Sequence, residues 1–309
     1  MLLSTPVFLF SRRKFTLKKV EKFPGICYSI GMENGRLKAL LKLLTSDTGT
    51  YQPVLRQEIA AALRADPARV QTVLAEEFSD KAPLSVLHTL EEIYWEELAQ
   101  AFSRFSSKIN PDLEEGLVLL SKFATPEAVR TEITATLDDM ARALRPALLN
   151  ATGQGDIARL LGHYFFHTLG FQPQQANLDI QSISFSHFLR ERRGSNLCMA
   201  CLYALLGARY GLDINLIDLA GRILVHLQDN THRQFCFIDP LDNGKILSQD
   251  DCRDYLTARQ LAWNDEFIAP MSSRQIVRRF IANMIFVLNK VHDERRLKYL
   301  RDYLGIVTN

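Results

Sequence analysis

The sequence lacks the features that would place it in a membrane or in a disulfide-bonded class of protein. None of its hydrophobic stretches reaches the roughly 20 consecutive apolar residues that a membrane-spanning helix needs. It has only five cysteines among 309 residues, an odd number without regular spacing. This cysteine content fits a reducing compartment better than a disulfide framework, so we expect a cytoplasmic protein.

An excess of charge of one sign is also missing, and so are the common nucleotide-binding motifs. The net charge is only +2, from 37 basic and 35 acidic residues, so nothing predicts a polyanionic partner. The sequence has no phosphate-binding P-loop, no dinucleotide-binding glycine fingerprint and no aromatic-basic nucleic-acid motif. We therefore expect no cofactor, and neither a nucleic acid nor a membrane as a partner.

Residues 1–31 differ in pattern from the rest of the N-terminal region. The apolar segment Met1–Phe10 comes before the basic residues, which is the reverse of a secretory signal. Periodic apolar residues begin only after Met32. We expect residues 1–31 to be a loose extension, for which an upstream start is one explanation, and a membrane or organelle address is the alternative.

Residues 32–105 carry the apolar periodicity of short amphipathic helices. Prolines stand near several of the expected helix starts, where a missing backbone N–H costs little. The predicted helices are Glu33–Leu44, Gln52–Arg64, a third that begins at Pro67, and a fourth over Pro83–Phe105. No strict sequence period links them, so the pattern favours a helical bundle, with an independent binding solenoid as the alternative.

Residues 106–270 mix helical and strand patterns, and residues 271–309 contain a helix pair. The most informative stretch begins with a polar turn in which Ser195 or Asn196 can cap an apolar helix that ends at Gly211. Cys198 then lies in the first helical turn. The unpaired N–H groups and the helix dipole at that position favour a thiolate over a thiol.

Two strand-like runs come after this helix, Arg222–Leu227 and Gln234–Ile238, with a polar turn between them. A hairpin centred on that turn pairs residues whose numbers sum to about 461. This register places Arg222 directly opposite Asp239. We expect the guanidinium and the carboxylate to form an ion pair across the strands.

Several short motifs succeed one another in a distinctive order in this half of the chain. They include Arg192-Arg193-Gly194, Leu202-Tyr203, Leu219-Ala220-Gly221, Ile238-Asp239-Pro240 and Gly244-Lys245-Ile246-Leu247-Ser248. In this order they resemble the bacterial SirB group of transglutaminase-like proteins, which are relatives of the papain-like cysteine hydrolases. The resemblance covers roughly residues 106–305 and is most specific over residues 188–252.

The resemblance implies an α+β fold, in which a helical N-terminal region precedes a transglutaminase-like domain with a small antiparallel sheet packed on the Cys198 helix. It also implies a triad of Cys at the helix start with His and Asp on adjacent strands. Cys198 falls on the nucleophile position and Asp239 on the acid position, but Arg222 occupies the histidine position. A guanidinium cannot act as a base near neutral pH.

We therefore predict a degenerate domain that serves as a binding or regulatory module for an unidentified protein partner. The alternative is a thiol hydrolase or acyltransferase that uses Cys198. His226 is a poor replacement base, because it lies four residues, or about 13 Å, along the strand from Arg222. His232 in the predicted turn is farther still, and no spacing supports His187.

Two further patterns would suit a metal or redox site but lack the necessary partners. Cys198 and Cys201 form a C-x-x-C pair, yet no strand precedes it and no second ligand pair has a matching spacing. We expect Cys201 to be a core residue. His163 and His167 have the i, i+4 spacing of metal ligands, but aromatic residues surround them and no third ligand is evident, so we predict no metal site.

Overall fold

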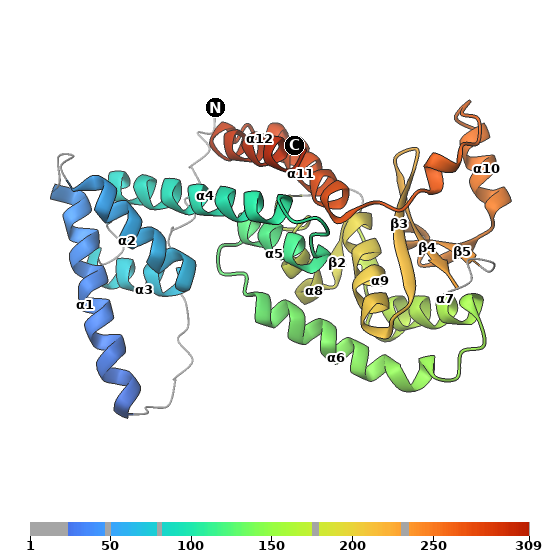
Figure 1. Cartoon of the computed structure of the whole chain (residues 1–309), viewed down its shortest axis with the longest axis horizontal. Coiled ribbons are helices and arrows are strands. Elements are labelled where there is room, and N and C mark those ends of the chain that lie inside the picture. Colours follow the sequence, from blue (N-terminus) through green and yellow to red (C-terminus); the bar gives the residue numbers. More distant parts are fainter. Residues whose placement is uncertain (1–23, 47–50, 79–81, 175–178, 230–234, 309) are drawn as a thin grey trace. The chain divides into compact units, whose positions relative to one another are not determined.

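The computed structural model describes residues 24–46, 51–78, 82–174, 179–229 and 235–308 (Figure 1). The chain divides into two compact units, residues 1–101 and 102–309. The first unit contains α1 (Pro24–Ser46), α2 (Gln52–Ala65), α3 (Pro67–Phe78) and most of α4 (Leu84–Ser106). The unit boundary therefore falls within α4.

The helices of the first unit match the predicted ones closely, except at the start of α1. Helix α1 packs against α2 and α3, and ion pairs such as Arg56 to Glu96 at 2.9 Å join α2 to α4. The predicted start of the first helix at Glu33 is wrong, because α1 begins at Pro24. Proline suits a helix start, and the apolar periodicity used for the prediction begins only at Leu37. Residues 1–23 of the expected loose extension lie outside the described residues.

The second unit contains the remaining helices. The α-helices are α5 (Leu113–Ala124), α6 (Arg130–Leu148), α7 (Gln154–Gly162), α8 (Phe185–Glu191), α9 (Asn196–Tyr210), α10 (Gln249–Thr257), α11 (Ser273–Lys290) and α12 (Glu294–Thr308). Short helical turns are η1 (His163–Thr168), η2 (Pro240–Asp242) and η3 (Asp265–Ile268). Helices α11 and α12 pack on each other and lie within residues 271–309.

Two small sheets accompany these helices. Strands β1 (Gln172–Pro173) and β2 (Arg193–Gly194) form a parallel pair. The main sheet is antiparallel in the order β3-β4-β5-β6, with bounds Asp213–Leu219, Arg222–Gln228, Phe235–Asp239 and Lys245–Leu247. Along the chain, helices come first and are followed by a small antiparallel sheet that packs on α9. This order confirms the predicted α+β fold.

The register of the β4–β5 hairpin differs from the predicted one by two residues. Val225 pairs with Ile238 and His226 pairs with Phe237, so the same register places Leu224, not Arg222, opposite Asp239. The predicted direct pairing is therefore wrong. A shift of two residues keeps every side chain on its original face of the sheet, and it makes Arg222 a diagonal neighbour of Asp239.

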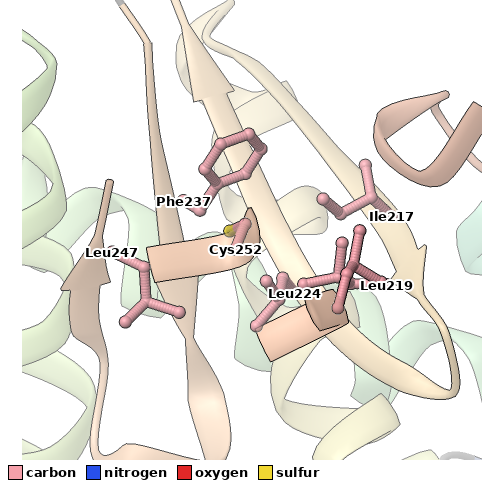
Figure 2. Close-up of a cluster of buried hydrophobic side chains, with 7 residues drawn as sticks. Ile217, Leu219, Leu224, Phe237, Leu247 and Cys252 are labelled. Atoms are coloured by element: carbon pink, nitrogen blue, oxygen red, sulfur yellow. The ribbon is translucent and has the colours of Figure 1, made fainter. Parts of the chain in front are cut away.

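The main sheet is covered on both faces. On one face, Ile214 of β3 lies so close to Gly207 of α9 that an added Cβ on the glycine would be 2.7 Å from the isoleucine side chain. The other face packs against α10 through a buried hydrophobic cluster (Figure 2): Ile217, Leu219, Leu224, Phe237, Leu247, Cys252 and Leu256. Arg222 and Asp239 share the α10 face with Leu224 and Phe237, because alternate residues of a strand point the same way.

Within the described part of the chain, no helix is both long enough and apolar enough to cross a membrane.

Candidate functional site

An open cleft of about 620 Å³ lies at the start of α9, next to the ends of β4 and β5. Helix α9 contributes its first two residues and its cap. The adjoining segments contribute most of the charge, through Arg222, Asp239, Asp242, Arg259 and Arg279. The cleft therefore coincides with the place where the sequence predicted an active site.

Arg222 and Asp239 form an ion pair in the wall of this cleft. The Nη2 group of Arg222 donates a hydrogen bond to Oδ2 of Asp239. The Asp239 side chain is completely buried, whereas 30% of the Arg222 side chain is exposed. Oδ1 of Asp239 accepts a second hydrogen bond, at 2.9 Å, from the backbone N–H of Leu241 in η2. The predicted ion pair is thus confirmed, although the register that suggested it was wrong.

Cys198 lies in the first turn of α9 but does not line the cleft. Ser195 caps the helix, as predicted, by accepting a hydrogen bond from the Cys198 backbone N–H. The Cys198 thiol is completely buried, and its Sγ is 3.4 Å from the Ser195 hydroxyl and 3.4 Å from the Ile183 carbonyl oxygen. The thiol donates to that carbonyl oxygen, so Cys198 is enclosed by protein groups and not exposed to the cleft.

The thiolate form expected for Cys198 is wrong, because its side chain is completely buried. Burial raises the pKa of its thiol to about 12, although the hydrogen bonds from Ser195 act in the opposite direction. The cost of removing a thiolate from water exceeds the stabilisation that a helix start offers. Near neutral pH Cys198 is therefore a thiol, not a nucleophilic thiolate.

Cys252 of α10, rather than Cys198, is the cysteine close to the ion pair. Burial is the main cause that raises the pKa of the Cys252 thiol, to about 11. The nearby charges of Asp251, Arg222 and Asp239 also act on it, the two carboxylates raising its pKa and the guanidinium lowering it. The structure thus brings Arg222 and Asp239 together and leaves Cys198 apart from them.

The other sequence candidates also lie outside the cleft. His226 is buried and stacks on Phe237, with ring centroids 4.9 Å apart. Cys201 is completely buried, as expected of a core residue, and burial raises the pKa of its thiol well above its usual range. His187 contacts Arg190 at 3.1 Å in α8. His232 lies outside the described residues.

His163 and His167 stack on each other in η1, a π-helical turn, with ring centroids 5.3 Å apart. Both side chains are exposed. Over the described ranges, no cluster of three or more His, Cys, Asp or Glu side chains has the geometry of a metal site.

Three residues that shape the cleft were not predicted from the sequence: Tyr255, Arg259 and Arg279. The Arg259 guanidinium lies 3.6 Å from the centre of the Tyr255 ring, and the Arg222 guanidinium lies 5.1 Å from the same ring. Arg279 of α11 also lines the cleft, and its Nη2 donates to the Gly221 carbonyl oxygen at 3.4 Å. The four-residue spacing of Tyr255 and Arg259 is the only sequence signal that points to any of these contacts.

Residues 131–282 match the model of a protein family that is described as the transglutaminase-like superfamily. The matched segment runs from α6 into α11 and includes Cys198, Arg222 and Asp239. Searches of curated proteins and of solved structures found no match.

Proposed function

We propose that residues 131–282, which form a transglutaminase-like superfamily domain, serve as a binding module without catalytic activity. The observation that carries this proposal is the ion pair between Arg222 and buried Asp239. These residues occupy the positions that the SirB resemblance assigns to the catalytic base and its acidic partner. The base has been replaced by a permanent cation, which uses the carboxylate as its counterion.

Acyl transfer through a cysteine requires a thiolate and a base in mutual contact. The sulfur and the base nitrogen must approach to about 3–3.5 Å, and the base must accept a proton. The Cys198 thiol instead contacts oxygens of Ser195 and Ile183. Among the described residues that line the cleft, none is a histidine. The cleft therefore offers binding groups without the groups that break an acyl bond.

The proposal includes a protein partner and a regulatory role, as in a degenerate member of the SirB group. The cleft remains open to solvent at about 620 Å³, a size suited to recognising a ligand or a partner side chain. The four described cysteines, Cys198, Cys201, Cys236 and Cys252, are free thiols. Free thiols support the cytoplasmic location that the cysteine content predicted.

Restoring the missing base should not restore catalysis. We expect Arg222→His to form no acyl-enzyme with a thioester of N-benzoylglycine, because the Cys198 thiol remains buried against Ser195 and Ile183. Intact-protein mass spectrometry of the wild-type chain and the variant reads this directly. Circular dichroism of the variant checks that it stays folded.

Cys198→Ser is the control that assigns any adduct to this thiol. An acyl adduct that forms on the wild-type chain and disappears in Cys198→Ser would overturn the proposal. The chain would then be the thiol hydrolase or acyltransferase that stands as the alternative. An adduct that forms only on Arg222→His would contradict the expectation that the Cys198 thiol stays closed off, but not the lack of activity of the wild-type chain.

A further inference from the structure

We infer that the cleft at the start of α9 binds a small organic anion, a carboxylate or a phosphate ester, through Arg259 and Arg279. This inference rests on the proposed binding function and names the chemical class of its ligand. It is carried by the charges of the cleft wall, which the structural ion pairs leave only partly compensated.

The three arginines of the cleft differ in how their charge is balanced. Arg222 is paired with Asp239. The closest carboxylate oxygen to Arg279 is that of Asp218, at 3.7 Å, which is beyond hydrogen-bonding distance. Within the described residues, Arg259 has no carboxylate partner. Two guanidinium groups therefore keep donors available to a ligand.

The acidic residues of the cleft do not cancel this charge. Asp239 is buried and is used by Arg222 and by the Leu241 backbone. Asp242 is exposed, and its carboxylate lies 3.8 Å from the Lys245 ammonium group. A ligand anion would therefore meet an uncompensated cation at Arg259 and a weakly compensated one at Arg279.

Arg259 is held in a fixed orientation by an aromatic ring. Its guanidinium stacks on Tyr255 at 3.6 Å, and its Nη1 donates to the Tyr255 carbonyl oxygen at 3.3 Å. A stacked guanidinium keeps its in-plane N–H groups free for a planar or tetrahedral oxyanion, at little further cost in side-chain entropy.

The start of α9 adds a favourable electrostatic contribution to the same cleft. Asn196 and Leu197, the first two residues of this 15-residue helix, line the cleft. The backbone N–H groups at a helix start carry partial positive charge, which favours an anion. The arginines and the helix start thus act on a ligand in the same direction.

The size and the walls of the cleft indicate an organic ligand rather than a bare inorganic ion. A volume of about 620 Å³ falls within the range of small-molecule sites, which is roughly 300–1,000 Å³. Leu241, which is partly exposed, gives the cleft apolar lining beside the charged groups, whereas Leu197 and Ile223 line it while almost completely buried. An apolar group on the ligand would contact Leu241 while its anionic group contacts the arginines.

Isothermal titration calorimetry with the full chain at low salt tests the inference. The probes are N-benzoylglycine, its neutral amide, phenyl phosphate and inorganic phosphate. We expect at least one of the two organic anions to bind, and the neutral amide to bind at least about tenfold more weakly than N-benzoylglycine if the carboxylate is the preferred group. Preference between N-benzoylglycine and phenyl phosphate distinguishes a carboxylate from a phosphate ester.

Two variants assign the binding to the cleft. Arg259→Gln should weaken binding of the organic anion by about tenfold, the loss expected for one charge-assisted contact. Arg253→Gln is the matched control, because this arginine also belongs to α10 but contacts Trp263 and Asp250 and does not line the cleft. The Arg253→Gln variant should bind the organic anion as tightly as the wild-type chain does.

The outcomes that overturn the inference are distinct from those that overturn the proposed function. Failure of both organic anions to bind, an equal loss in both variants, or binding of inorganic phosphate as tight as that of phenyl phosphate would each refute the organic-anion site. The organic-anion site would also be refuted if the neutral amide binds as tightly as N-benzoylglycine and phenyl phosphate does not bind. The proposed function is refuted by a different observation, an acyl adduct on Cys198 of the wild-type chain, and none of these binding results bears on it.

Discussion

Replacing Arg222 by alanine is expected to lower the free energy of unfolding by about 3–5 kcal/mol. The reason is that Asp239 is completely buried. Without Arg222 its carboxylate keeps the hydrogen bond from the Leu241 backbone but loses its counterion. An unpaired charge in a protein interior is costly, and this cost exceeds the loss of the pair's own attraction. Urea unfolding followed by circular dichroism measures the difference.

Arg142→Ala is the matched control for this variant. Arg142 pairs with Asp139 at 2.6 Å, but both side chains are at least 70% exposed. Ion pairs of this kind contribute about 0–1 kcal/mol. Combining Arg222→Ala with Asp239→Ala should recover part of the lost stability, because no buried charge is then left unpaired. Equal small losses for Arg222→Ala and Arg142→Ala would show that the cleft does not depend on the ion pair.

Gly244→Ala is expected to cost about 2–5 kcal/mol, from two additive causes. Gly244 has a φ of +77°, where a side chain adds backbone strain of roughly 1–2 kcal/mol. A Cβ at this position would also lie 2.8 Å from the Tyr203 hydroxyl oxygen and 2.9 Å from Cε2 of Phe166. Overpacking of a tightly packed site typically costs about 1–3 kcal/mol. The same urea experiment measures the sum.

Gly211→Ala separates the two causes. Gly211 has a similar φ of +67°, but no atom would lie within 4 Å of an added Cβ. This control should therefore show only the strain, about 1–2 kcal/mol. Adding Tyr203→Phe to Gly244→Ala removes one of the two close contacts and should recover part of the loss. If the two glycine variants are equally destabilised, the turn at Gly244 does not pack against Tyr203.

The features that local chemistry determines could be predicted from the sequence. The cap at Ser195 and the helix end at Gly211 each depend on residues within one turn, and both are present. The pairing of Arg222 with Asp239 was also predicted, because strand alternation places both side chains on one face under either register. The exact partner across the strands was wrong, since polar turn residues alone do not determine where a hairpin turns.

The burial of Cys198 and the charged wall of the cleft could not be predicted in the same way. Cys198 is closed off by Ser195 and by the Ile183 carbonyl, which belongs to a segment just before α8. Arg259 and Arg279 meet at the cleft from different parts of the chain, 20 residues apart in sequence. Such contacts depend on how helices pack on the sheet, and no local pattern encodes them.

The central claim is that the Cys198 thiol does not reach the cleft, and its rate of alkylation tests this most directly. The reference is Cys236, whose side chain is only partly buried and whose thiol pKa burial raises to about 11, against about 12 for Cys198. Limited iodoacetamide treatment of the native chain, with peptide mass spectrometry, gives both rates. We predict that Cys236 reacts first, and that Cys198 reacts only in urea concentrations that unfold the domain. Faster labelling of Cys198 than of Cys236 in the native chain would contradict the account.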